Sequence, residues 1–275
     1  MMSHPQKEKA DSFHALHEGA GAFVIPNPWD PPSARLLAGL GFRALATSSA
    51  ASAAVLGRRD GGITREQALA HARAIVEATS LPVSADLERG FGESPEVVAE
   101  TVKLAAEAGL VGCTIEDSTG KPEHPLYDFS LAVERIAAAA EAARALPFRF
   151  MLTARAHNFV YPQPSLDETI RRLQAFEKAD ADVLFAPGLP DLTAIRTVCS
   201  SLSKPFNFMV GIKGKSFSID ELAAAGVRRI SLATSLYRAA MSGLVAAARE
   251  VKDSGQFSFV EKGMTTAELN ELMGI

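Results

Sequence analysis

Three acidic residues in the first half of the chain stand where they could hold a divalent cation together. Asp86 and Glu116 close two short apolar runs, and Asp60 lies in the segment that follows an earlier run. Hard cations such as Mg²⁺ prefer carboxylate and water oxygens, and they commonly take only one or two direct protein ligands. Without a cation, gathered carboxylates would repel one another and raise each other's pKa. The three acids therefore predict a site for Mg²⁺, with Mn²⁺ as the alternative ion.

Arg155 closes a further apolar run and supplies a positive group suited to an acidic substrate. Its planar guanidinium can bind a carboxylate through two parallel hydrogen bonds, which a lysine cannot reproduce. His157 follows two residues later and is a candidate proton carrier. The plainer alternative is that Arg155 only neutralises Glu116, while Asp60 caps a helix or faces solvent.

The elements that must position these residues form eight short apolar runs, which alternate with longer helical patterns. This order is typical of parallel strands joined by crossover helices. In a (β/α)8 barrel the carboxyl ends of the strands converge at one mouth, where this fold carries out its chemistry. We predict an α/β fold of this class, a TIM barrel, formed as one domain over residues 1–275. The predicted strands are Phe23 to Pro26, Ala44 to Ser48, Pro82 to Asp86, Gly112 to Asp117, Phe150 to Arg155, Val183 to Pro187, Phe206 to Val210 and Arg229 to Ala233.

A doubly wound open sheet is the main structural alternative. The chain reads Asn27-Pro-Trp-Asp30 after its first predicted strand, where a dinucleotide-binding fold would carry Gly-x-Gly-x-x-Gly. Eight successive strands in an open sheet would also leave two exposed edges. Both observations favour the barrel.

Local signals mark where the predicted helices begin and end. Four sites have the form of a capping box, a serine precedes a proline at a fifth helix start, and three glycines follow helices. Beyond the eighth helix, residues 253–275 form an additional C-terminal helical segment, which either folds back on its own barrel or contacts another copy. The capping pairs are Thr64 with Gln67, Ser165 with Glu168, Ser218 with Glu221 and Thr265 with Glu268; the other signals are Ser94-Pro95, Gly41, Gly109 and Gly226.

The composition argues against several partners. A formal net charge of -4 supplies no basic field for nucleic acid or anionic lipid. We find no run of about twenty apolar residues, and the stretch through His17 lacks the hydrophobic segment of a signal peptide. We therefore expect a cytoplasmic protein without nucleic-acid or membrane partners. Cys113 and Cys199 are predicted to pack as small core residues rather than to pair.

Several stretches between about Ala22 and Val245 resemble the isocitrate lyase and phosphoenolpyruvate mutase superfamily, in particular its carboxyphosphonoenolpyruvate mutase and oxaloacetate decarboxylase branch. The resemblance implies an Mg²⁺-dependent enzyme that acts on a small α-oxo or hydroxy acid through an enolate-like species. The matching stretches are Asn27-Pro-Trp-Asp-Pro-Pro-Ser-Ala-Arg-Leu, Ala46-Thr-Ser-Ser-Ala, Leu56-Gly-Arg-Arg-Asp60-Gly, Ser84-Ala-Asp86-Leu-Glu-Arg-Gly-Phe-Gly92, Ile115-Glu116-Asp117 and Thr153-Ala-Arg155.

The resemblance also implies roles for individual residues. Asp60, Asp86 and Glu116 would be the acids of the metal shell, binding directly or through water. Arg155 would be the electrophilic clamp, acting in catalysis with Glu116 and Asp60. A small carboxylic-acid substrate would lie in a cradle formed by Ser48, Ser49 and Ala50. The whole protein would be a homotetramer in which the C-terminal helices exchange between neighbours.

Two departures from the pattern limit what the resemblance implies. Ser84 stands where many members carry the first aspartate of an Asp-Ala-Asp pair, so Asp86 becomes the principal direct ligand. The lyase branch carries Lys-Lys-Cys-Gly-His on a mobile loop after the fourth strand, but residues 118–127 here contain no cysteine. Cleavage that needs this acid is disfavoured, and the loop asparagine of the mutase branch is also missing. Thr119, Lys121 and His124 are the candidates for gating and proton transfer.

The leading hypothesis is a lyase-type enzyme that cleaves a carbon-carbon or carbon-phosphorus bond in a small α-oxo acid, with oxaloacetate decarboxylation as the specific reaction. Alternatives are a carboxyphosphonoenolpyruvate or phosphoenolpyruvate phosphonomutase, a 2-methylisocitrate lyase, and a catalytically weakened barrel that binds an oxo acid. A lysine-dependent aldolase is disfavoured, because Lys213 and Lys215 lie in a loop and not at a strand end.

Overall fold

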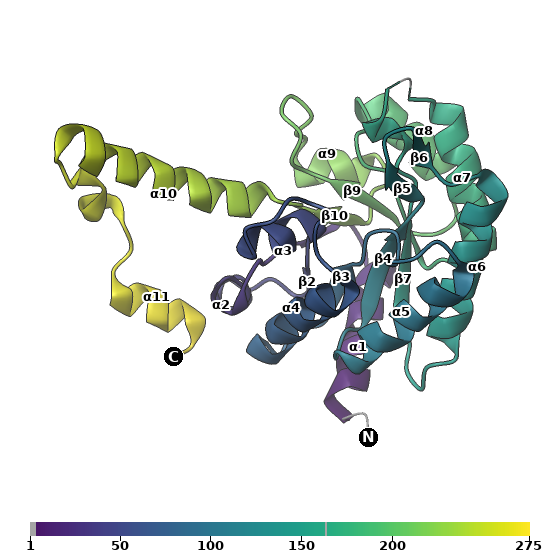
Figure 1. Ribbon diagram of the computed structural model, residues 1–275, viewed down its shortest axis with the longest axis horizontal. Helices are drawn as coiled ribbons and strands as arrows, with labels where there is room; N and C mark the ends of the chain where they lie inside the picture. Colours follow the sequence, from purple (N-terminus) through teal and green to yellow (C-terminus); the bar gives the residue numbers. More distant parts are fainter. Residues whose placement is uncertain (1–3, 163) are drawn as a thin grey trace.

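The computed structural model describes residues 4–162 and 164–275, and its centre is a parallel sheet of eight strands (Figure 1). All eight predicted strands are confirmed, although each is shorter than its apolar run. The remaining apolar residues continue into the loops at the strand ends. The strands are β1 (Phe23–Ile25), β2 (Leu45–Ala46), β3 (Val83–Asp86), β4 (Gly112–Glu116), β7 (Met151–Arg155), β8 (Val183–Phe185), β9 (Phe206–Met209) and β10 (Arg229–Ser231).

The sheet curls into a nearly closed barrel. Its strand order is β1-β10-β9-β8-β7-β4-β3-β2, and neighbouring strands pair in parallel. The two ends of this order meet where the Ala46 amide donates to the Pro26 carbonyl at 3.1 Å. The side-chain amide of Asn27 strengthens the junction, because it donates to the Thr47 carbonyl at 3.0 Å and accepts from the Leu232 amide at 2.8 Å. The predicted TIM barrel is thus confirmed, and the open sheet was the wrong alternative.

Helices surround the barrel and bury apolar faces against it. Three of the four predicted capping boxes form, at Thr64, Ser218 and Thr265. Ser165 accepts from the Glu168 amide, but the Glu168 carboxylate pairs with arginines instead of closing the box. The helices after the strands are α2 (Pro31–Gly39), α3 (Ser49–Val55), α4 (Arg65–Ala78), α5 (Pro95–Glu107), α6 (Phe129–Arg144), α7 (Leu166–Lys178), α8 (Leu192–Ser200), α9 (Ile219–Ala224) and α10 (Ser235–Ser254).

A helix that the sequence patterns did not predict, α1 (His4–Glu18), covers the amino end of the barrel. Its Phe13 is fully buried. The side-chain amide of Gln6 donates to the carbonyls of Ala106 and Leu110, at 2.8 and 3.0 Å, just ahead of β4. A side chain at Gly112 would collide with the neighbouring strand and crowd Phe13, so the glycine makes room for the ring. The helix therefore closes the barrel opposite its mouth.

A small antiparallel hairpin, also unpredicted, follows β4 at the mouth side. It consists of β5 (Ser118–Lys121) and β6 (His124–Leu126). A short 3-10 helix, η1 (Asn158–Val160), follows β7. These two insertions rise beside the mouth and leave the barrel strands unchanged.

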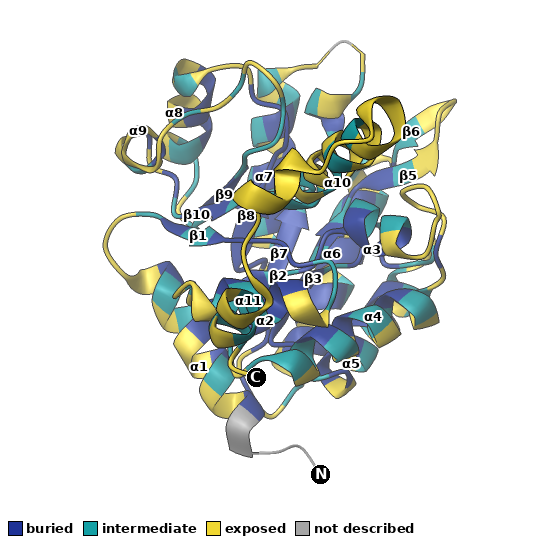
Figure 2. Ribbon diagram, turned by 90° about the vertical axis from the view of Figure 1, so that its left-hand side faces the viewer, coloured by how far each residue is buried: buried dark blue, intermediate teal, exposed yellow. Residues whose placement is uncertain are grey.

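The chain ends in the predicted additional helical segment. After α10 come η2 (Ser258–Lys262) and α11 (Thr266–Met273). Figure 1 shows α10 extending away from the barrel before the chain turns back, and in both views α11 lies beside α2 (Figures 1 and 2). An ideal Cβ at Gly39 would lie 1.9 Å from the Leu272 carbonyl oxygen, which shows how close this contact is. Within the described ranges, no helix is both long and apolar enough to span a membrane.

Candidate active site

The predicted site residues gather around a cavity of about 150 Å³ at the carboxyl ends of the strands. Asp86 and Arg155 enter it from the ends of β3 and β7, and Asp60 enters from the loop between α3 and α4. Ser48, Ser49 and Ala50, at the start of α3, form part of the same wall. A small organic acid fits a space of this size. The barrel therefore brings residues from distant segments together at its mouth, where this fold carries out its chemistry.

Arg155 occupies the centre of the acidic group. Its Nη1 lies 3.3 Å from Glu116 Oε2 and 3.8 Å from Asp86 Oδ2. The guanidinium stacks over the Phe185 ring, 5.1 Å from its centroid, and Nη2 lies 3.4 Å from Nε2 of His157. Among the described residues, its buried Nε has no hydrogen-bond partner. Arg155 thus lies close to both acids, including Glu116 that the plainer alternative named, and keeps a donor available.

Asp86 is fixed by the backbone on both of its carboxylate oxygens. Oδ1 accepts from the Glu88 amide at 3.1 Å, and Oδ2 accepts from the Ser49 amide at 3.4 Å. Burial raises the pKa of Asp86, and the negative charges of Glu116 and Asp60 raise it further against the opposing effect of Arg155. The carboxylate is therefore oriented before any ligand binds, and Arg155 is the positive group beside it.

Glu116, the last residue of β4, lies behind Arg155 and is not part of the cavity wall. His157 approaches it from the other side, with Nδ1 3.1 Å from Glu116 Oε2. Burial favours the neutral acid, but Arg155 and His157 together outweigh burial and lower the pKa of Glu116. Glu116 is therefore an ionised anchor for Arg155 and His157.

Glu88 follows Asp86 by two residues and is a further acid of this group. It has a φ of 51°, which is uncommon for a residue with a side chain, and its carboxylate is buried. Burial, followed by Asp86 and Asp60, raises the pKa of Glu88 to about 7. Its Oε1 has no hydrogen-bond partner within the described part of the chain. A fourth carboxyl group thus lies at the site. The positive φ of Glu88 could not be predicted from its residue type.

A buried arginine holds the loop that carries Glu88. Arg135 of α6 donates to the carbonyl oxygens of Arg89, Gly92 and Glu93, and its guanidinium lies 4.1 Å from the centroid of the Tyr127 ring. These contacts stabilise the unusual backbone of the loop. Surroundings that fix strained residues in this way are common at functional sites.

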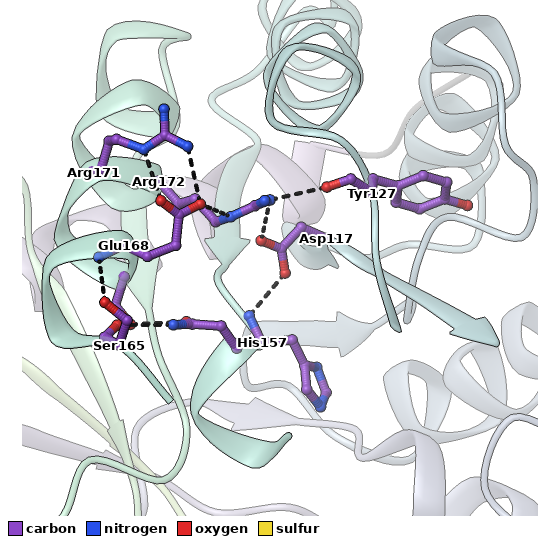
Figure 3. A network of polar contacts seen from close by, with 9 residues as sticks. Asp117, Tyr127, His157, Ser165, Glu168, Arg171 and Arg172 are labelled. Atoms are coloured by element: carbon purple, nitrogen blue, oxygen red, sulfur yellow. Dashed lines mark hydrogen bonds and ion pairs between the residues drawn. The ribbon is translucent and has the colours of Figure 1, made fainter. Parts of the chain in front are cut away.

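A second polar network supports the strand end that carries Arg155 (Figure 3). Buried Asp117 accepts from the His157 amide at 2.8 Å and from Nη1 of Arg172 at 3.1 Å. Arg172 also donates to the Tyr127 carbonyl at 3.2 Å and to the Glu168 carboxylate at 2.8 Å. Asp117 therefore orients the loop after β7, and the network fixes His157 beside Glu116.

The three candidate gating residues lie on the exposed hairpin and not on the cavity wall. Lys121 forms an ion pair with Glu93 at 2.6 Å, which ties the hairpin to the loop that carries Glu88. The Thr119 hydroxyl donates to the His124 carbonyl within the hairpin. These contacts make the hairpin a compact unit at the rim, and the gating role remains a prediction.

The donor set at the mouth fits a hydrated Mg²⁺ or Mn²⁺. Asp60, Asp86, Glu88 and Glu116 offer carboxylate oxygens, and the unpaired Oε1 of Glu88 leaves one of them unsatisfied. Among the described side chains, no three acids, histidines or cysteines converge tightly enough to coordinate one ion together. Mg²⁺ commonly takes one or two protein ligands and keeps several waters, so this spacing suits Asp86 as the principal ligand.

Both cysteines are free thiols, in agreement with the prediction that they do not pair. Cys113 is fully buried within β4, and burial raises the pKa of its thiol far above the usual range. Cys199 belongs to α8, and burial raises its pKa to about 12. Neither is among the residues that line the cavity in the described part of the chain. The site therefore has no thiol acid.

Sequence reasoning missed the deeper wall of the cavity. Thr114, Phe185, Asn207 and Arg229 face it from β4, β8, β9 and β10. Thr114, Asn207 and Arg229 precede the carboxyl ends of their strands, where polar side chains are not expected from the barrel rule, and Phe185 is apolar. The signal for Arg229 was available, since a charged residue at the start of a buried strand is unusual.

Comparisons with known proteins agree with this geometry. An oxaloacetate decarboxylase of Ectopseudomonas mendocina is 31% identical over 250 residues, covering 88% of this chain and 84% of that protein. The 2-methylisocitrate lyase of Escherichia coli K12 is 32% identical over 209 residues, covering 72% and 69%.

Solved structures match more completely. One from Burkholderia cenocepacia J2315, provisionally described as a lyase/mutase, is 48% identical with a TM-score of 0.97, covering 99% of this chain and 98% of that one. A 2,3-dimethylmalate lyase, a member of the PEP mutase/isocitrate lyase superfamily, is 29% identical with a TM-score of 0.86, covering 97% and 95%. Residues 13–252 match the family described as phosphoenolpyruvate phosphomutase. The chain therefore belongs to the phosphoenolpyruvate phosphomutase family, whose relatives include lyases and mutases of this superfamily.

Proposed function

We propose that this protein is a divalent-cation-dependent lyase that cleaves a small α-oxo acid, with oxaloacetate decarboxylation as its reaction. The observation that carries the proposal is the position of Arg155, between Asp86 and Glu116 on a cavity large enough for a small acid. The relatedness to an oxaloacetate decarboxylase over most of both chains supports the same reaction.

Arg155 stabilises the charge that this reaction develops. As oxaloacetate loses carbon dioxide, the bond between C3 and C4 breaks, its electron pair forms a C2–C3 double bond, and negative charge collects on the C2 oxygen. A guanidinium already held in place stabilises that oxygen without reorganising solvent. Glu116 and the Phe185 ring keep the guanidinium in position.

The other residues of the wall bind and orient the acid. We infer that Ser48, Ser49 and Ala50 hold the carboxylate next to the oxo group. Asp86, assisted by Asp60, Glu88 and Glu116, would hold Mg²⁺ or Mn²⁺. When bound, this ion supplies a Lewis acid that polarises the oxo group.

The absence of a thiol acid favours decarboxylation over the cleavage of a methylisocitrate-like substrate. Release of a succinate-like group requires an acid near the leaving carbon. Cys113 is buried, and neither Cys113 nor Cys199 is among the described residues that line the cavity, so neither can supply this acid. Decarboxylation releases carbon dioxide, which needs no proton on departure, and the enolate that remains takes one proton from water at C3 to become pyruvate.

Product analysis on four candidate substrates tests the proposal. Oxaloacetate, phosphonopyruvate, carboxyphosphonoenolpyruvate and methylisocitrate are each incubated with the protein, with Mg²⁺ or with a chelator. We expect pyruvate from oxaloacetate in the Mg²⁺ sample alone, at a rate above the reaction without protein. Turnover of another acid would replace the substrate assignment. Binding of oxaloacetate without any turnover would instead favour a barrel that only binds oxo acids.

A further inference from the structure

Arg229 is a buried cation without an acidic partner. It is the first residue of β10, and only 4% of it is exposed. Its Nε donates to Asn207 Oδ1 at 2.8 Å, and its Nη2 donates to Thr153 Oγ1 at 2.9 Å. No carboxylate of the described residues lies within 4.0 Å of the guanidinium, and its Nη1 makes no hydrogen bond to them.

Such an arrangement is energetically unusual. Buried charges are almost always paired, because removal from water costs several kcal/mol that only an opposite charge or a full set of hydrogen bonds can offset. Burial lowers the pKa of Arg229 to about 9, so the group still carries its proton at neutral pH. The nearest titratable group on the amino-end side, His17, is neutral there, because burial and Arg229 lower its pKa to about 3. The chain itself thus leaves this charge unbalanced.

The unpaired cation faces the same cavity as Arg155. Arg229 lines the cavity at the start of its strand, whereas Ala233 and Thr234 line it beyond the strand's end, so Arg229 marks the floor. Thr153, which accepts from Arg229, precedes Arg155 by two residues on β7, so the side chains of Thr153 and Arg155 both face the inside of the barrel. Two residues along a strand span roughly 7 Å, so the guanidinium groups address the cavity from different depths.

We propose that Arg229 is a second anion-binding group of the site and binds the far carboxylate of a dicarboxylic oxo acid. The proposal rests on the proposed function, because Arg155 and the α3 segment are taken to bind the oxo group and the carboxylate next to it. Arg229 then selects four-carbon diacids over monocarboxylates such as pyruvate. Asn207 is a positioning residue, since it contacts Nε of Arg229 and donates to Ser231 Oγ at 3.1 Å.

Calorimetric titration with two ligands tests this assignment. The first is the diacid 3,3-difluorooxaloacetate and the second is pyruvate, each titrated with Mg²⁺ into wild type, Arg229→Met and the control Arg228→Met. Arg228 neighbours Arg229 but is only partly buried, and it donates to the Gly19 and Gly21 carbonyls instead of lining the cavity. We expect Arg229→Met to weaken diacid binding about 30-fold or more and pyruvate binding less than 3-fold. The control keeps both affinities.

Thermal unfolding without ligand distinguishes binding from a structural role. Replacing Arg229 by methionine removes the desolvation cost of the buried charge, but Asn207 and Thr153 each lose one hydrogen bond. Because these effects oppose each other, the Arg229→Met protein should unfold close to the wild-type temperature. A lower unfolding temperature together with unchanged preference for the diacid would show a structural role and overturn the proposal.

A second variant keeps the test decisive if Arg229→Met does not fold. Asn207→Asp places a carboxylate beside Nε of Arg229 and supplies the missing internal counter-ion. This variant should fold and lose affinity for the diacid selectively. Equal loss of both ligands, or no loss in either variant, would overturn the role of Arg229. Wild type that binds neither ligand would instead refute the proposed function.

Discussion

At the mouth of the barrel, one arginine contacts two carboxylates that would otherwise face each other. Arg155 lies within 4 Å of both Asp86 and Glu116, while Glu88 and Asp60 add negative charge nearby. Burial raises the pKa of both Asp86 and Glu88, and the neighbouring carboxylates raise it further. A bound divalent cation would offset this rise, so the electrostatics of the residues themselves favour a metal.

Arg155→Lys tests whether the shape of the guanidinium matters as well as its charge. Lysine keeps the positive charge but lacks the planar fork that binds a carboxylate or enolate through two hydrogen bonds. We expect affinity for oxalate, measured by calorimetry with Mg²⁺ present, to fall about tenfold or more, since one charge-assisted hydrogen bond contributes about 1.5 to 3 kcal/mol. Undiminished affinity in a folded variant would contradict the clamp.

The sequence was sufficient to predict some of these residues and insufficient for others. Asp86, Glu116 and Arg155 stand at strand ends, so the rule that barrel mouths carry chemistry found them. Arg229 was not predicted as a site residue, because it is the first residue of its strand and lies at the floor of the cavity, far from the strand end. Glu88 depends on a backbone conformation with positive φ, which residue type alone does not indicate for glutamate.

At the scale of elements, α1 shows how a terminal helix completes the barrel. It buries Phe13 and His17 against the amino end, where the His17 ring meets Phe13 and Phe23 edge-on at 4.8 and 5.0 Å. Among the described residues, Nε2 of His17 has no partner. Protonation of His17 would place a second cation near Arg229, and burial together with Arg229 lowers its pKa from 6.5 to about 3.

This shift predicts acid lability that depends on His17. Between about pH 6.5 and pH 3 the unfolded chain binds a proton that the folded chain does not, so the free energy of unfolding falls as the pH is lowered. From pH 7 to 4.5 the loss amounts to about 2.5 kcal/mol from this residue. His17→Asn should show a correspondingly smaller loss in chemical denaturation, and His124→Asn on the exposed hairpin serves as control. An equal loss in wild type and His17→Asn would contradict this account.

Strands and helix ends were largely predictable, whereas insertions were not. Apolar runs located all eight strands, because each strand is buried on both faces. Helix α1 escaped prediction because its buried residues are few and spread among charged ones. The hairpin β5–β6 escaped because residues 118–126 carry polar and turn-forming residues instead of an alternating pattern.

At the scale of the whole molecule, the barrel has a buried core, whereas α10 has no buried residue. The helix has twenty residues and buries none of them in this chain, although Leu244, Val245 and Val251 are apolar (Figure 2). Leu244 and Val251 lie one heptad apart, on one face of the helix with Ala248. We propose that a second copy covers this face, and that the expected homotetramer forms through it. In such an assembly, α11 would pack against α2 either of its own copy or of a neighbouring copy.

Size-exclusion chromatography with light scattering tests this assembly. Wild type should have a mass several times that of the 29.2 kDa chain. The double change Leu244→Glu and Val251→Glu should shift the protein toward the monomer, because it places charge on the apolar face. Asp253→Lys, on the opposite side of the same helix, should leave the mass unchanged. A wild type that is monomeric at all concentrations would contradict the assembly.

The most direct test of the central claim is a titration of Mn²⁺, followed by electron paramagnetic resonance, into wild type and Asp86→Asn. The substitution keeps the shape of the side chain and removes one charge, and Glu123→Gln on the exposed hairpin removes the same charge elsewhere. We predict one Mn²⁺ per chain in wild type and in the control, and affinity about 100-fold lower in Asp86→Asn, with loss of Mg²⁺-dependent oxaloacetate turnover. Equal Mn²⁺ affinity in wild type and Asp86→Asn would contradict the account.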